Sequence, residues 1–274
     1  MSVKSESILG KKMNDLSYTA KVFKTVWVSD VHLGTKGSRA KEFLEFLKTI
    51  ECEKIFLVGD IVDGWQLSKR WYWPQTHNDV VQKILEKAKR GTEIIFIPGN
   101  HDEVARDFVG LTLGGIKVKD DDIHHTVDGK KFWVVHGDLF DNVIQHARWL
   151  AYIGDWAYVF LLKTNAVFNA IRRLFKLPYW SLSQYLKSKV KLAVSFMSAF
   201  EKSIATETRR RGCDGVICGH IHKAEMKMVE DIMYANDGDW VESMTALVEN
   251  LDGKLEIIEW TKTKGRLMPV EGIK

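Results

Sequence analysis

The sequence predicts an α/β protein with two packed sheets, and the pattern of apolar residues carries that prediction. Over residues 23–98, short apolar runs alternate with helical segments, which indicates a largely parallel sheet with helices on its faces. After His101 the apolar runs follow one another without helices, which indicates a second, mostly antiparallel sheet. The chain has 274 residues, 45% of them apolar, so it can bury a sizeable core.

Each predicted element follows from a local pattern. Residues 55–58 form an apolar run typical of a strand that is buried on both faces. Residues 41–50 and 80–88 carry apolar side chains at helical spacing. Later strands are predicted at 116–118, 123–127, 132–135 and within 224–260, with turns at Asp128-Gly129 and Asp252-Gly253.

The composition of the chain argues against a secreted, a membrane-spanning or a disulfide-rich protein. Residues 1–21 are polar and lack the apolar core of a signal peptide, so we expect a tail there and a second tail over 263–274. We expect no transmembrane helix, because no long uncharged apolar run is present. The 3 cysteines are scattered, which argues against disulfides or a cysteine zinc site and favours a reducing, cytoplasmic location.

Residues with metal-binding chemistry follow several predicted strands directly. Ligands collect beyond the carboxyl ends of strands in an open α/β sheet, so these side chains should point into one site. Oxygen and imidazole donors without a thiolate disfavour a structural zinc site and favour Mn or Fe, with Mg or Zn as alternatives. The clusters are Asp30-Val31-His32, Gly59-Asp60-Ile61-Val62-Asp63, Gly99-Asn100-His101-Asp102, His136-Gly137-Asp138 and Gly219-His220-Ile221-His222.

Taken in order, these five blocks resemble those of the calcineurin-like metallophosphoesterases, over about residues 22–260. Residues 234–243 are also similar to the bacterial UDP-2,3-diacylglucosamine hydrolase branch of that family. The resemblance implies a four-layer α/β/β/α sandwich of two sheets, with residues 22–140 and 212–262 as its core. It also implies an enzyme that hydrolyses phosphoester or diphosphate bonds with two divalent metal ions.

The metal ligands can be assigned on this basis. Two ions about 3.5–4 Å apart supply both a nucleophile and charge neutralisation for phosphoester hydrolysis. Asp60, at a rigid strand end, is the expected bridging ligand, and manganese is the ion we expect first. The remaining ligands would be Asp30, His32 and His222 for one ion, and Asn100, His136 and His220 for the other.

His101 is expected to act without ligating a metal. In the family, the His of the Gly-Asn-His block lies beside the metals and is proposed to protonate the leaving group or to stabilise the transition state. Asp63 would orient its imidazole. The best-known UDP-2,3-diacylglucosamine hydrolases carry Arg at the position of His101. The chain therefore represents either a sister branch with the same substrate or an enzyme for a different phosphoester.

Residues 141–211 are expected to form a helical cap inserted into the core. The segment holds 12 Lys+Arg and 4 Asp+Glu, a net charge of +8 in a chain whose total is +4. Aromatic residues such as Trp149 and Trp156 lie among the charges. Such helices suit an anionic substrate or peripheral contact with a membrane, but a solvated helical face packed on the core would have the same composition. Both interpretations stay open.

A loop of four aromatic residues and an arginine, 64–74, follows Asp63 directly. This loop could stack a base or line an acyl groove, or it could pack beneath the cap. Arg39 follows the first block and could reach a phosphate, and the resemblance alone suggests that residues after the last block border the cleft. The candidate substrate contacts are therefore Arg39, Trp65, Arg70, Asn236, Asp239 and Trp240.

Three functions are compatible with these patterns. The first is hydrolysis of UDP-2,3-diacylglucosamine to UMP and 2,3-diacylglucosamine 1-phosphate, a step of lipid A biosynthesis, by a cytoplasmic enzyme peripheral to the inner face of the membrane. The second, which His101 permits, is a phosphodiesterase or phosphatase for soluble nucleotides or phosphoproteins. The third is an inactive scaffold, which the complete set of metal blocks disfavours. We expect no nucleic acid and no obligate protein partner.

Overall fold

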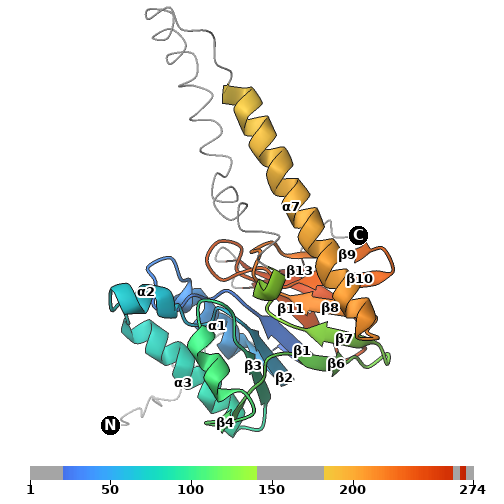
Figure 1. Ribbon diagram of the computed structural model, residues 1–274. Coiled ribbons are helices and arrows are strands. Elements are labelled where there is room, and N and C mark those ends of the chain that lie inside the picture. Colours follow the sequence, from blue (N-terminus) through green and yellow to red (C-terminus); the bar gives the residue numbers. More distant parts are fainter. Residues whose placement is uncertain (1–20, 141–181, 262–265, 270–274) are drawn as a thin grey trace, which may run out of the picture.

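The computed structural model describes residues 21–140, 182–261 and 266–269 and arranges them around two sheets (Figure 1). The larger sheet has 8 strands in the order β13-β12-β11-β1-β2-β3-β5-β4. Its strands are β1 (Lys21–Val28), β2 (Ile50–Val58), β3 (Glu93–Ile97), β4 (Thr112–Leu113), β5 (Ile116–Val118), β11 (Thr245–Glu249), β12 (Leu255–Thr261) and β13 (Arg266–Pro269).

The centre of the larger sheet is parallel. β1 pairs with β2, β2 with β3 and β3 with β5 in parallel register, while β11, β12, β13 and β4 add antiparallel edges. Helices α1 (Ala40–Thr49) and α3 (Gln75–Lys89) connect the parallel strands, and the short helix α2 (Gly64–Lys69) follows β2. The strand and helix alternation predicted for this half of the chain is confirmed.

Side-chain alternation along β1 separates two apolar layers. Val26 and Val28 face a cluster that includes Phe43 of α1, whereas Trp27 joins a second cluster that includes Phe132 of the smaller sheet. Because neighbouring residues of a strand point to opposite faces, one strand serves both layers. The second cluster lies between the sheets and holds them together.

The smaller sheet has 5 strands in the order β6-β7-β8-β10-β9. Its strands are β6 (Asp122–His125), β7 (Lys131–Val134), β8 (Gly215–Cys218), β9 (Glu225–Val229) and β10 (Ile232–Asn236). Two short 3₁₀ helices, η2 (Glu103–Phe108) and η3 (Asp138–Phe140), lie before and after β4–β7 along the chain. β7, β8 and β10 are parallel to one another, and only the edge strands β6 and β9 are antiparallel.

The prediction of a mostly antiparallel second sheet was therefore wrong in detail. The long connection between β7 and β8 includes the helix α7 (Leu182–Arg210), so the chain crosses over and re-enters the sheet in the same direction. Residues 116–118 and 245–261 have the short strands expected of the second sheet, but they pair with the larger one. Both sheets are mixed.

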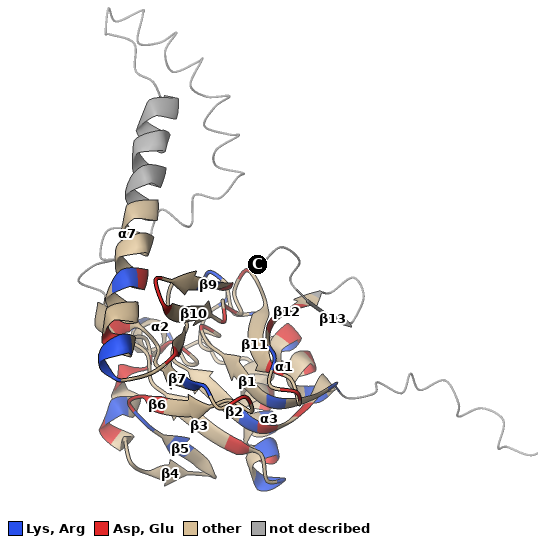
Figure 2. Ribbon diagram, turned by 90° about the vertical axis from the view of Figure 1, so that its right-hand side faces the viewer, with Lys and Arg blue, Asp and Glu red and all other residues tan. Residues whose placement is uncertain are grey.

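Helix α7 lies on the outer side of the smaller sheet, opposite α1 and α3, which completes the α/β/β/α order of layers (Figure 1). Phe200, Ile204 and Ala205 of α7 pack with Trp133 and Tyr234 of that sheet. The C-terminal half of α7, which was expected to belong to the cap, is thus part of the core. Basic residues gather near the C-terminal end of this helix (Figure 2). Residues 1–20, 141–181, 262–265 and 270–274 lie outside the described residues. Of the two predicted tails, 1–21 and 263–274, the structure describes Lys21, which begins β1, and residues 266–269, which form β13. No helix among the described residues is long and apolar enough to cross a membrane.

Candidate metal centre

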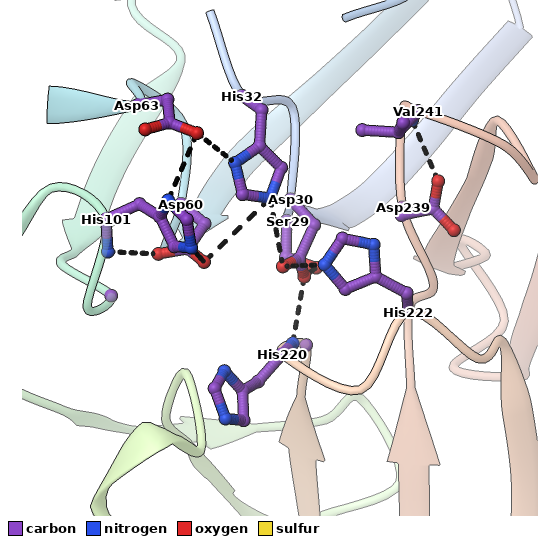
Figure 3. A network of polar contacts seen from close by, with 12 residues as sticks. Ser29, Asp30, His32, Asp60, Asp63, His101, His220, His222, Asp239 and Val241 are labelled. Atoms are coloured by element: carbon purple, nitrogen blue, oxygen red, sulfur yellow. Dashed lines mark hydrogen bonds and ion pairs between the residues drawn. The ribbon is translucent and has the colours of Figure 1, made fainter. Parts of the chain in front are cut away.

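The polar clusters lie at the carboxyl ends of β1, β2, β3, β7 and β8, where the parallel orientation of these strands brings them to one edge of the sandwich. Figure 3 shows Asp30, Asp60 and His222 from three of these clusters close together. Main-chain hydrogen bonds join the loops to one another. Asp30 N–H donates to Gly59 O at 3.0 Å, and His32 N–H donates to Asp60 O at 2.9 Å. The loops after β1 and β2 therefore form a continuous support for the site.

The backbone of the candidate ligands is strained. Among the described residues, 7 residues other than glycine have φ in the left-handed region, and 5 of these are candidate ligands. A conformation of this kind costs about 1–3 kcal/mol per residue and persists only where the surrounding structure holds it in place, as it often does at functional sites. The residues are Asp30, His32, Asp60, His220 and His222, with φ between 51° and 71°.

Glycine at position 59 allows a close approach at the same point. Gly59 has φ +80°, and a Cβ there would lie 2.3 Å from Nδ1 of His136. Only a glycine can combine this turn with the imidazole packed against it. This turn after β2 places Asp60 next to His136.

The candidate ligands form adjoining groups in which the donor atoms lie within 4.8 Å of one another. One group is Asp30, His32 and His222, and another is Asp60, His136 and His220. Asp60 also groups with His32 and His101, so it lies between the first two groups. This is the arrangement that two ions with a shared carboxylate require, although the assignment of each ligand, Asn100 included, to an ion stays a prediction.

Buried atoms in these groups suit a cation. Asp60 Oδ2 and His136 Nε2 have no hydrogen-bond partner among the described residues, and Asp30 Oδ1 lies 3.0 Å from Nε2 of His222, another candidate ligand. Leaving such atoms unpaired is costly, and a divalent cation would satisfy all of them. His136 Nδ1 lies 2.7 Å from the main-chain oxygen of Val58, and the N–H placed there leaves the Nε2 lone pair free for a metal.

The charges of the site act on one another strongly. Burial alone would raise the pKa of Asp60, but His136 outweighs it and lowers the pKa to about 2. Burial opposes protonation of the imidazoles, but Asp60 raises the pKa of His136 to about 10 and Asp30 raises that of His222 to about 9. Without a metal, these imidazoles hold protons at neutral pH, and metal binding must release them.

His101 lies beside both groups. Its Nδ1 lies 3.1 Å from Asp63 Oδ2 and its Nε2 lies 3.9 Å from Asp60 Oδ2. The indole of Trp65 lies over the imidazole, with ring centroids 4.4 Å apart. Burial opposes ionisation of Asp63, but its hydrogen bonds to His101 and His32 hold its pKa below the ordinary range. An ionised Asp63 can hold the Nδ1–H of His101, which directs Nε2 toward the metal groups.

Asp102 holds the loops that carry Asp60 and His101. Its carboxylate accepts the backbone N–H of Gly99 at 2.6 Å and that of Ile61 at 2.8 Å, with longer bonds from the N–H groups of Asp60 and Val62. One buried side chain therefore links the ends of β2 and β3.

The candidate substrate contacts fall into two sets. Arg39, Trp65 and Arg70 are exposed. Trp65 contacts His101, and Arg39 Nε donates to the main-chain oxygen of Val241 at 3.2 Å. Their assignment to substrate stays a prediction.

The other set is enclosed by protein. Trp240 is fully buried between Phe43 and Phe46, so its assignment as a substrate contact does not hold in this structure. Asn236 donates to Gly219 O at 2.6 Å and accepts the N–H of Gly238. Asp239 accepts the backbone N–H of Val241 and adds to the negative charge near His222. These residues shape the loop after β10.

Sequence reasoning missed two groups that support the site. His77 of α3 is buried, and its Nδ1 accepts the N–H of Gly34 in the loop after His32. Ser29 and Asp237 lie within hydrogen-bond distance of each other beneath Asp30. Asp237 follows β10 directly, so the strand-end rule applied to the other clusters would have found it.

The fold and the metal groups together define a metal-dependent hydrolase of phosphoesters. The family model for calcineurin-like phosphoesterases matches residues 23–224, and the chain belongs to that family. The resemblance stated from the five blocks is therefore confirmed. Divalent metal ions bound here would activate water and neutralise the charge of the phosphoryl group.

The names of two curated relatives are more specific than the name of the family. The chain is 23% identical to a UDP-2,3-diacylglucosamine hydrolase of Edwardsiella ictaluri (strain 93-146) over 204 residues, 73% of this chain and 76% of the relative. It is 26% identical to a UDP-2,3-diacylglucosamine hydrolase of Azotobacter vinelandii over 144 residues, 51% of this chain and 58% of the relative.

Two solved structures illustrate what the chain is similar to. A single mutant of Vps29 from Entamoeba histolytica has a TM-score of 0.45 and 15% identity, covering 90% of this chain and 96% of its own. The phosphoesterase YfcE from E. coli also has a TM-score of 0.45 and 15% identity, and the match covers 91% of this chain and 99% of the YfcE chain.

Proposed function

We propose that the enzyme hydrolyses the diphosphate of a UDP-linked acylated glucosamine, with UDP-2,3-diacylglucosamine giving UMP and 2,3-diacylglucosamine 1-phosphate. The observation that carries the chemistry is the position of Asp60 between two groups of candidate ligands. The names of the curated relatives and the similarity of residues 234–243 to that branch support the substrate.

Two ions held by these residues would leave distinct tasks to the protein. Asp60 and Asp30 supply the negative charge that holds the ions, while His32, His136, His220 and His222 supply neutral donors. We propose manganese as the ion, since the donors are oxygen and imidazole nitrogen without a thiolate. His101 would donate its Nε2 proton to, or form a hydrogen bond with, the leaving oxygen.

The Asp63–His101 pair favours a second candidate. A diphosphate releases a phosphate, which is a weak base, whereas an alkyl phosphoester releases an alkoxide that needs a proton. An acid held ready by Asp63 is therefore most useful on an ester. The second candidate is a phosphodiesterase or phosphatase acting on soluble nucleotides or phosphoproteins.

Peripheral contact of the 141–211 segment with the inner face of the membrane belongs to the same proposal. Its support is compositional, a net charge of +8 with aromatic residues interspersed, and residues 141–181 lie outside the described residues. A lipid-linked diphosphate has its reactive phosphorus near the bilayer surface, where such a segment would help the enzyme dock.

Product analysis tests the substrate. Purified enzyme with Mn²⁺ is incubated with detergent-dispersed UDP-2,3-diacylglucosamine, and with a soluble nucleotide diester in parallel. Release of UMP and a lipid phosphate, at a kcat/KM well above that for the soluble diester, is the expected result. Turnover of the soluble diester alone would favour the second candidate.

A further inference from the structure

The hydroxyl of Ser29 lies within hydrogen-bond distance of three oxygen atoms. Its Oγ is 2.6 Å from Asp30 Oδ2, 2.6 Å from Asp237 Oδ1 and 3.1 Å from the main-chain oxygen of Gly238. Asp30 and Asp237 are both fully buried, and Ser29 is almost so. The residues that meet here are 208 positions apart, and the contact joins the loop after β1 to the loop after β10.

If both carboxyl groups are ionised, the single hydroxyl proton of Ser29 cannot account for two short contacts. A serine hydroxyl carries one proton and can donate it to one partner only. The second carboxylate would then face a hydroxyl oxygen at 2.6 Å with lone pairs on both sides, which is repulsive. Two contacts this short are both attractive only if one carboxyl group supplies a proton of its own.

The surroundings of the two carboxyl groups decide which one holds that proton. Asp30 Oδ2 also accepts the backbone N–H of His220 at 2.8 Å, and Asp30 Oδ1 lies 3.0 Å from His222 Nε2. Among the described residues, Ser29 is the side chain within hydrogen-bond distance of Asp237 Oδ1, and Asp237 Oδ2 has no hydrogen-bond partner. Burial, together with the nearby charge of Asp30, raises the pKa of Asp237 well above its ordinary value.

We propose that Asp237 is a neutral carboxylic acid that donates through Ser29 to the metal ligand Asp30. The Asp237 Oδ1–H donates to Ser29 Oγ, and the Ser29 hydroxyl donates to Asp30 Oδ2. This pair of hydrogen bonds fixes the orientation of the Asp30 carboxylate, so that Oδ1 points toward His222 and the candidate cation site. Asp237 and Ser29 are positioning residues for the metal centre, whatever the substrate.

The absence of a side chain at Gly219 lets Ser29 approach both carboxyl groups. A Cβ at position 219 would lie 2.2 Å from Ser29 Oγ and 2.7 Å from Asp30 Oδ2. Any larger residue would push the hydroxyl away from both carboxyl groups. Gly219 directly precedes the candidate ligand His220, and its small size also keeps Ser29 in place beside Asp30.

Infrared spectroscopy tests the protonation of Asp237 directly. The wild-type protein at neutral pH is expected to show the C=O stretch of a protonated carboxylic acid that is missing from Asp237→Asn. The difference between these two spectra isolates Asp237 from other acids. If the wild type shows no such band that Asp237→Asn lacks, Asp237 is ionised and the proposal is overturned.

Titration with Mn²⁺ tests the effect on Asp30. Ser29→Ala and Asp237→Ala should each weaken Mn²⁺ binding about 10–100-fold, as loss of a hydrogen-bonded support to a ligand does. Asp237→Asn keeps an N–H donor toward Ser29 and should restore near wild-type affinity. Ser203→Ala removes a hydroxyl that donates within α7 and is the matched control. Wild-type Mn²⁺ affinity in a folded Ser29→Ala variant would show that Ser29 does not support Asp30.

Discussion

Asp63 Oδ2 lies 3.1 Å from Nδ1 of His101. The same oxygen lies 3.2 Å from Nδ1 of His32, a candidate metal ligand, so a single carboxylate oxygen serves two imidazoles (Figure 3). The other oxygen, Oδ1, accepts the N–H of Gln66 and begins helix α2. Asp63 therefore links the metal centre, the proposed acid and the local backbone.

Replacing His101 should separate catalysis from metal binding. We expect His101→Ala to retain its metal ions and to lose about 10²–10⁴-fold in turnover of esters with a poor leaving group, the range typical of general acid catalysis. The loss should be smaller on a diphosphate or an activated ester. The exposed His125 provides the control His125→Ala, which should behave as wild type. Loss of metal from His101→Ala would make His101 a ligand.

Replacing Asp63 should affect both of its imidazole partners. Asp63→Asn keeps the size of the side chain but removes the charge that holds the two Nδ1–H groups. We expect Mn²⁺ affinity to fall about 10–100-fold, in addition to a loss of turnover at saturating Mn²⁺. Calorimetric titration and kinetics on the same preparation measure the two effects. Unchanged Mn²⁺ affinity would show that Asp63 serves His101 alone.

The stability of the metal-free protein should fall as pH rises from 6.5 to 10. Folding raises the pKa of His136 to about 10 and that of His222 to about 9, from an ordinary 6.5. Their contribution is complete below pH 6.5 and is lost as pH rises through the folded values. A loss of about 1 kcal/mol lowers Tm by about 2–4 °C in a chain of this size, so the shift is measurable by calorimetry.

Saturating Mn²⁺ is the control for that pH series. A metal ion takes the place of the imidazole protons, so the fall in Tm should be absent from the metal-bound protein. A metal-free protein with constant Tm over this range would contradict the assigned charge state of the two histidines.

The sequence located the candidate ligands better than the residues that support them. Each candidate ligand comes within a few residues of an apolar strand, so a local rule locates it. The partners that support these ligands are distant in the chain, as with Ser29 and Asp237, and only the folded structure brings them together. Trp240 was assigned to the substrate from its position after the last block. That position does not reveal that its side chain packs against α1.

The sheets show the same limit. The strand pattern of residues 116–118 is correct, but a strand of three residues does not indicate which sheet will pair with it. Helix α7 was expected in a cap, yet Phe200 and Ile204 are fully buried and rank with the most buried of the described residues. Periodicity predicts an apolar face but not the partner that covers it.

Binding to anionic vesicles tests the proposed membrane contact. We expect co-sedimentation at low salt that is reversed as salt rises, because the screening length falls to roughly 3 Å at 1 M. Basic residues near a membrane contribute about 1 kcal/mol each, so changing Arg172, Arg173 and Lys176 to Glu should greatly weaken binding. Activity on a short soluble diester should survive these changes. A wild-type protein that stays in the supernatant at low salt would favour a soluble substrate.

The metal content of Asp60→Ala, with its turnover of a chromogenic phosphodiester, tests the shared-ligand centre most directly. Asp60 is almost fully buried and lies in two of the candidate ligand groups. Removing it should therefore weaken both ions at once. We predict two bound ions and turnover in the Mn²⁺-loaded wild type, and loss of metal with no detectable turnover in a folded Asp60→Ala variant. An Asp60→Ala protein that retains two ions and near-normal turnover would contradict the assignment of this centre.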